Sequence, residues 1–108
     1  MPKYRRIPTI SGNEPKDDPF FAAEFAPDDA ANVLDLHGLT VAEAKHALDL
    51  FLDRAVATGS AVVKVIHGKG TGALAAFLAE ALPGDPRVAD TRPSHRPGES
   101  AVLARLYR

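Results

Sequence analysis

The sequence contains no cysteine and no tryptophan, and it has a single methionine among its 108 residues. The missing cysteines exclude disulfide bonds, thiolate metal sites and cysteine nucleophiles, and they fit a reducing compartment. No hydrophobic run approaches the roughly 18 residues that a membrane-spanning helix needs. The N-terminus is basic, but no apolar segment follows it, so we expect no signal peptide. These absences favour a cytoplasmic protein without a membrane partner.

A strong excess of charge of one sign is also missing, because the net charge is only −1. This average conceals a gradient along the chain. Residues 1–33 carry four basic and six acidic side chains, whereas residues 64–108 carry seven basic and four acidic ones. Basic charge therefore collects in the C-terminal part, where it favours an anionic partner. The length allows one domain with a single core.

Residues 1–32 differ in composition from the rest of the chain. They hold five of the nine prolines and three of the five phenylalanines, namely Phe20, Phe21 and Phe25. Proline-rich, charged sequence predicts an extension rather than a regular element. The phenylalanines predict that this extension is partly ordered, either packed on its own domain or docked to a protein partner. We therefore expect an extension over residues 1–32 and a domain over residues 33–108.

Hydrophobic periodicity predicts four strands and two helices in the order βαβαββ. Thr40 and Glu43 have the spacing of a capping box, and Gly59 is the expected stop of the first helix. Right-handed crossovers place both helices on one face of a four-stranded mixed sheet, which makes an α/β two-layer sandwich. The expected strands cover residues 32–37, 61–66, 87–91 and 101–107, and the second helix covers residues 71–82.

A glycine-rich turn, residues 67–72 with the sequence HGKGTG, joins the second strand to the second helix. Glycines let the backbone approach a ligand closely, and the unpaired N–H groups of a first helical turn favour an anion. Lys69 adds a positive charge, and His67 belongs to the residue type that exchanges protons near neutral pH. A plain tight turn would also explain the glycines. The phosphate contacts that this turn predicts are Gly68, Lys69, Gly70, Thr71 and Gly72.

Two histidines are expected at one edge of the sheet. Alternation along the first strand puts Asp35 and His37 on the face opposite Leu34 and Leu36. Because the carboxyl ends of parallel strands meet at the same edge, His37 should lie near His67. This edge is where open α/β sheets bind ligands.

The segments LDLHG (residues 34–38) and IHGKG (residues 66–70), with Glu43-Ala44 between them, resemble the small MutS-related, or Smr, domain. Its hallmark motifs are LDxH and HGxG, and the resemblance covers about residues 33–108. It implies a sandwich similar to the C-terminal domain of a bacterial translation initiation factor. It also implies nucleic-acid binding and, in several members, nicking or RNA-cleaving endonuclease activity. The family usually has a Gly-Gly-x-Gly run before the last strand, where residues 96–100 read RPGES and keep only Gly98.

Phosphodiester hydrolysis needs a proton acceptor, a proton donor and positive charge to stabilise the transition state. His37 and His67 could supply the first two, and Lys69 with the helix start could supply the third. Asp35 could orient His37, bind a divalent metal or accept hydrogen bonds from loop amides. His67 could instead hydrogen-bond to the glycine loop.

His95 and Arg96, in the loop before the last strand, are further candidates for phosphate contacts. No second acidic residue accompanies Asp35 in the motifs, so the sequence gives little support to a two-metal carboxylate site. It favours a metal-independent reaction or one with a single loosely held Mg²⁺. A non-catalytic module that binds DNA, RNA or the ribosome is the alternative function, and a protein-interaction domain is a third.

Overall fold

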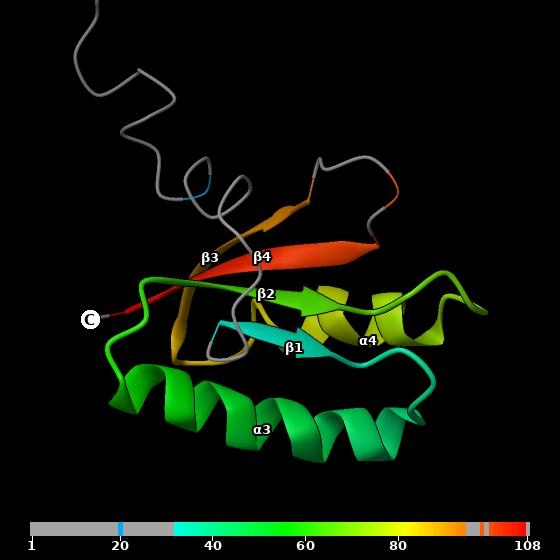
Figure 1. The fold of residues 1–108 in the computed structure, drawn as a ribbon, viewed down its shortest axis with the longest axis horizontal. Helices are drawn as coiled ribbons and strands as arrows, with labels where there is room; N and C mark the ends of the chain where they lie inside the picture. The colour runs from blue at the N-terminus through cyan, green and yellow to red at the C-terminus, as the bar shows by residue number, and fades with distance from the viewer. Residues whose placement is uncertain (1–19, 21–31, 95–97, 99, 108) are drawn as a thin grey trace, which may run out of the picture.

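The computed structural model describes Phe20, residues 32–94, Gly98 and residues 100–107. The described strands form one sheet in the order β1-β2-β4-β3 (Figure 1). The element order is the predicted βαβαββ. The bounds are β1 Val33–Asp35, α3 Val41–Ala57, β2 Val62–Ile66, α4 Ala73–Ala81, β3 Val88–Pro93 and β4 Ala101–Leu106.

The sheet is mixed, because β1 and β2 pair in parallel while β4 pairs antiparallel with both β2 and β3. Both helices lie on the same side of the sheet in Figure 1, which confirms the predicted two-layer α/β fold. Parallel neighbours need a crossover connection, and α3 supplies it between β1 and β2. The starts of α3 and α4 therefore lie at the same edge, beside the carboxyl ends of β1 and β2.

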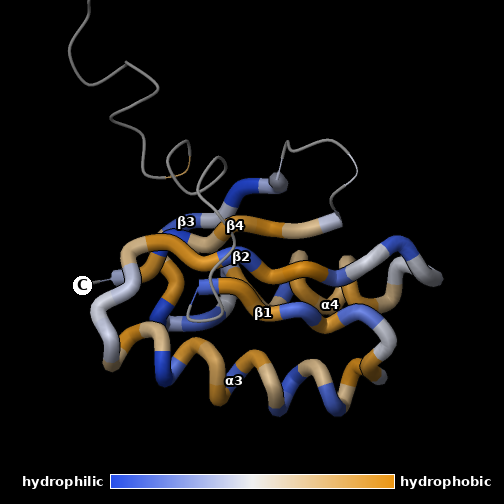
Figure 2. Tube along the Cα trace, viewed as in Figure 1, coloured by the Kyte–Doolittle hydropathy of each residue, from blue (hydrophilic) through white to orange (hydrophobic). Residues whose placement is uncertain are grey.

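The core lies between the sheet and the two helices. β2 contributes Val63 and Val65, and α4 contributes Leu78. Figure 2 shows hydrophobic and hydrophilic stretches alternating along α3, as expected of a helix with one buried face. Burial of such side chains contributes roughly 1.5–3 kcal/mol each and holds both helices in place against the sheet. The buried residues of α3 are Ala44, Leu48, Phe51, Leu52 and Ala55.

Several predicted boundaries were wrong by a few residues. β1 ends at Asp35 rather than His37, because the Asp35 carboxylate accepts a hydrogen bond from the His37 backbone N–H and turns the chain out of the strand. α4 begins only at Ala73, since Gly72 has φ +89°, which a right-handed helix cannot include. β3 continues to Pro93 because its last residues pair with β4.

Of residues 1–31, the structure describes Phe20 alone. Its side chain is 3% exposed, and the guanidinium carbon of Arg92, on β3, lies 4.4 Å from the ring centroid. Phe20 thus packs against the domain, whereas Phe21 and Phe25 lie outside the described residues. Over the residues that are described, no helix combines the length and the hydrophobicity that crossing a membrane requires.

Candidate functional site

Asp35 and His37 form a hydrogen-bonded pair just after β1. Asp35 Oδ1 lies 2.7 Å from His37 Nδ1 and accepts the His37 backbone N–H at 3.0 Å. Because a carboxylate only accepts, Nδ1 carries the proton and Nε2 is the nitrogen left for other partners. The side chains of His37 and Asp35 are 72% and 47% exposed, so solvent and ligands reach the pair. The hydrogen bond from His37 lowers the pKa of Asp35 and keeps this carboxylate ionised.

Gly68 brings the glycine loop directly against His37. It has φ +81°, and a Cβ built on it would lie 2.9 Å from the His37 Cβ, well inside van der Waals contact. Two constraints therefore require glycine here, the left-handed backbone and the adjacent histidine. The LDxH and HGxG segments, which are distant in sequence, meet at this contact.

His67 is tied to the glycine loop. Its Nδ1 donates a hydrogen bond to the Gly68 carbonyl oxygen at 2.8 Å, so Nε2 is the nitrogen left for chemistry. The backbone N–H groups of His67 and Gly68 both donate to the Ser100 carbonyl oxygen, at 2.8 and 3.2 Å. The residue just before β4 thus anchors the loop from its first residue onwards. Sequence reasoning missed Ser100, because a backbone carbonyl partner leaves no signal in residue type.

The first turn of α4 has no side-chain cap. Gly72 occupies the N-cap position and provides no side-chain acceptor, and no acidic residue lies in the first turn. The Ala73 N–H reaches the Thr71 hydroxyl oxygen at 3.3 Å, longer than a usual hydrogen bond. The positive end of the helix dipole therefore faces the space beside the loop, and the exposed Lys69 adds a full charge.

A cavity of about 250 Å³ lies between the starts of the two helices. Its walls are residues 38–41, which lead into α3, together with Gly68 and residues 70–75 of the glycine loop and α4. Glycines and backbone amides at a helix start suit a phosphate group better than an apolar ligand. Gly68, Gly70, Thr71 and Gly72, all predicted phosphate contacts, are brought together here.

Lys69, also a predicted phosphate contact, is not among the residues that line this cavity. His95 and Arg96 lie outside the described residues, so their phosphate contact stays a prediction. The described part of the chain has no group of three or more His, Cys, Asp or Glu side chains that could hold a metal ion. Asp35 Oδ1 already accepts two hydrogen bonds from His37. This donor set does not fit a Mg²⁺ ion held by protein side chains alone, since Mg²⁺ demands octahedral oxygen ligands.

Comparison with known proteins identifies the family. The family model of the Smr domain matches residues 34–106. The chain is 52% identical over 59 residues to the endonuclease MutS2 of Symbiobacterium thermophilum, and 51% identical over 55 residues to that of Thermus thermophilus. These matches cover 55% and 51% of this chain but 7% of each MutS2 protein. The chain thus spans less than a tenth of the length of these relatives.

Two solved structures share the fold. The crystal structure of the Smr domain of Thermus thermophilus MutS2 matches with a TM-score of 0.66 and 40% identity, over 71% of this chain and 99% of that domain. YdaL, a stand-alone small MutS-related protein from Escherichia coli, matches with a TM-score of 0.71 over 97% of this chain and 82% of its own. At 21% identity, the match to YdaL shows the fold alone. Because the family model spans most of the domain and both motifs that meet at Gly68, the chain belongs to the Smr domain family.

Proposed function

We propose that this protein binds nucleic acid at the sheet edge formed by the glycine loop and the start of α4. The uncapped first turn of α4, the 250 Å³ cavity beside it and the exposed Lys69 support binding of a phosphate group. The endonuclease name of the MutS2 relatives agrees with a nucleic-acid ligand. Phosphate contacts position a strand without reading its bases, so we expect little sequence preference.

We further propose that the Asp35–His37 pair takes part in cleavage of a phosphodiester bond. The observation that carries this proposal is the 2.7 Å hydrogen bond that assigns the proton to Nδ1 and leaves the exposed Nε2 as a base. Nε2 of neutral His37 would take the proton of the attacking water or hydroxyl, and Asp35 would stabilise the imidazolium that forms. His67, when charged, would protonate the leaving oxygen through Nε2. The α4 amides and Lys69 would stabilise charge on the phosphoryl oxygens.

Single-turnover cleavage of labelled DNA and RNA strands by saturating enzyme tests this mechanism, because saturation removes the effect of affinity. His37→Ala should lower the cleavage rate by about 10²–10⁴-fold, the usual cost of losing a positioned acid or base. Asp35→Asn should change the rate in the same direction, and both variants should still bind the strand. Arg54→Ala is the control, since Arg54 is an exposed residue of α3 that lines neither cavity. Full activity of His37→Ala would refute the mechanism.

The alternative function is a non-catalytic module that binds DNA, RNA or the ribosome through the same loop. The RPGES sequence of residues 96–100 favours it, because Glu99 puts a negative charge where the family usually has a glycine-rich run. Binding by the parent protein without cleavage of either strand type, in Mg²⁺, in Mn²⁺ and in chelator, would establish this alternative. Absence of any salt-sensitive binding to nucleic acid would contradict both functions.

A further inference from the structure

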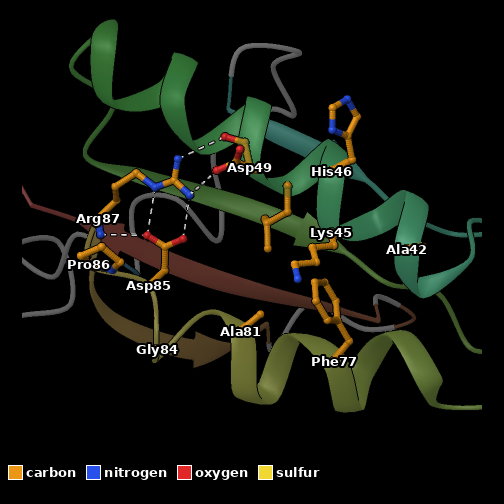
Figure 3. A pocket seen from close by; sticks show the side chains of 11 residues that line it. Ala42, Lys45, His46, Asp49, Phe77, Ala81, Gly84, Asp85, Pro86 and Arg87 are labelled. Atoms are coloured by element: carbon orange, nitrogen blue, oxygen red, sulfur yellow. Dashed lines mark hydrogen bonds and ion pairs between the residues drawn. The ribbon is translucent and has the colours of Figure 1, made fainter.

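A second cavity, of about 630 Å³, lies in the groove between α3 and α4 (Figure 3). It lies farther along the two helices than the smaller cavity at the glycine loop. On α3 the smaller cavity is lined by residues up to Val41 and the larger one from Ala42 onwards. On α4 the smaller cavity is lined by residues up to Ala75 and the larger one from Phe77 onwards. The two cavities therefore follow one another along α3 and α4, and the smaller one is the proposed phosphate site.

The charges along this groove change sign with distance from the glycine loop. Lys45 and His46, both exposed, line the stretch nearer the loop. At the far end Asp49 and Asp85 both bind Arg87, at 3.0 and 2.7 Å. Lys45 lies five residues after the Thr40 cap, which is a rise of about 7.5 Å along the helix. A nucleic-acid strand that runs from the glycine loop along the groove would thus meet Lys45 and His46 before any carboxylate.

An aromatic ring lies beside these groups. Phe77 is half-buried, packs partly against the core and lines the groove with its remaining surface. In Figure 3 the Lys45 side chain reaches towards the Phe77 ring across the groove. Aromatic rings next to basic side chains are the platforms on which proteins stack unpaired bases. A paired base is already stacked on both faces, so only an unpaired or extruded base can use this ring.

The far end of the groove offers acceptors for the edge of a base. The Asp49 side chain is 64% exposed, and Arg87 contacts its Oδ1. Exocyclic amino groups of adenine, guanine and cytosine are donors, and a carboxylate accepts from them. The volume of about 630 Å³ falls within the roughly 300–1,000 Å³ typical of small-ligand sites. A cation and an aromatic ring thus face each other across the groove, and a carboxylate lies farther along it. These three groups suit the phosphate, the base face and the base edge of one nucleotide.

We infer that the α3–α4 groove is a nucleotide subsite that holds one unpaired nucleotide of the substrate strand. Lys45 and His46 contact its phosphate, and Phe77 stacks on its base. The inference rests on the proposed binding of nucleic acid at the glycine loop and names its preferred substrate as single-stranded or locally unpaired nucleic acid.

Matched charge reversals on α3 test the phosphate contact. Lys45→Glu changes a groove residue, and Arg54→Glu makes the same change at an exposed residue of α3 outside the groove. We expect Lys45→Glu to weaken binding of a single-stranded oligonucleotide about tenfold or more at moderate salt. The loss for a fully paired duplex should be much smaller. Arg54→Glu should leave both affinities close to those of the parent.

Substitutions of Phe77 test the stacking contact. Phe77→Leu keeps an apolar side chain that packs on the core but removes the ring, and should weaken single-strand binding about tenfold. Phe77→Tyr keeps the ring and should bind as the parent does. Thermal melts of both variants report whether the fold is intact. If Phe77→Leu and Phe77→Tyr are equally stable, a difference in their affinities for the single strand measures the contribution of the ring.

Amide NMR spectra of the full chain, titrated with adenosine monophosphate and with inorganic phosphate, separate the two parts of the groove. The nucleotide should shift Lys45, Asp49 and Phe77, whereas phosphate alone should shift the glycine loop. Equal effects of Lys45→Glu and Arg54→Glu, or parent-like binding by Phe77→Leu, would overturn the subsite while the parent still binds nucleic acid. Loss of binding by the parent itself would instead remove the proposed function.

Discussion

The two helices start at the same edge of the sheet but begin in different ways. At α3, Thr40 Oγ1 accepts the Glu43 backbone N–H at 3.1 Å, and Glu43 Oε1 accepts the Thr40 N–H at 2.9 Å, which completes the predicted capping box. At α4, Gly72 holds the N-cap position without a side-chain acceptor, and the first turn has no acidic residue. α3 thus carries its own anion at its positive end, and α4 does not.

This difference separates a helix start that stabilises the fold from one that is available to a ligand. A polar N-cap contributes about 0.5–2 kcal/mol, and an acidic side chain in the first turn adds to it. α4 lacks this stabilisation at Gly72, and its first residues line the 250 Å³ cavity. The comparison therefore explains why the proposed phosphate site lies at α4 although both helix starts border the cavity.

The largest effect on stability is expected from a variant at the far end of the α3–α4 groove, away from both helix starts. Arg87 binds both carboxylate oxygens of Asp85, at 2.9 and 2.7 Å, and also Asp53 at 2.7 Å and Asp49 at 3.0 Å (Figure 3). Arg87→Ala should lower the free energy of unfolding by about 2–3 kcal/mol, because it leaves the half-buried Asp85 without its charged partner. Denaturant unfolding measures this loss, and Arg87→Lys, which lacks the bidentate fork, should recover only part of it.

The loss of stability in Arg87→Ala should depend on pH. The hydrogen bond from Arg87 lowers the pKa of Asp85 from its ordinary value of 3.8. A carboxyl group with a lowered pKa stabilises the fold above its unfolded pKa and loses that contribution as pH falls through the folded value. The stability difference between the parent and Arg87→Ala should hold from about pH 7 to pH 5 and shrink below about pH 4. A difference that grows towards acid would contradict this assignment.

Giving α4 an anion of its own should break the contrast between the two helix starts. Ala73 is exposed and is the first residue of α4. Ala73→Glu should stabilise the helix by about 0.3–1 kcal/mol through the dipole. It should also weaken nucleic-acid binding about tenfold, because the carboxylate repels the phosphate. Ala79→Glu adds the same charge at an exposed position near the other end of α4 and serves as control. Equal affinity of the two variants would place the phosphate elsewhere.

The reverse change, removal of the cap from α3, should have the smallest effect. Thr40→Ala should lower the free energy of unfolding by about 1 kcal/mol, the usual value of an N-cap hydroxyl. Thr40→Ser keeps the hydroxyl and should restore most of that stability. Binding to nucleic acid, measured by fluorescence anisotropy, should not change in either variant. A loss of affinity as large as that of Ala73→Glu would make the start of α3 part of the phosphate site.

Features set by near neighbours in the chain could be predicted from the sequence. The three-residue spacing of Thr40 and Glu43 predicted the capping box, and Gly59 was predicted to stop α3, where it has φ +77°. The end of β1 is a local feature that was nevertheless missed, because alternation continues through His37. The Asp35 side chain competes with the strand for the His37 N–H, and periodicity does not register such competition.

The meeting of the two motifs could be predicted from strand topology, but contacts between individual distant side chains could not. Arg87 meets Asp49 and Asp53 across separations of 38 and 34 residues, so nothing near it in sequence marks its partners. Gly68 is the more instructive case. Its residue type suggested close approach to a phosphate, but the structure shows that glycine is required there because His37 packs against it. Its phosphate contact stays a prediction.

The proposal that a nucleic-acid phosphate sits at the start of α4 is tested most directly by amide NMR of the full chain titrated with a short oligonucleotide. We predict saturable shifts of residues 69–75 that weaken as salt is raised, while the capped amides of residues 41–43 move little. The proposal would be contradicted if the amides of residues 69–75 did not shift and those at the start of α3 or on the helix-free face of the sheet did.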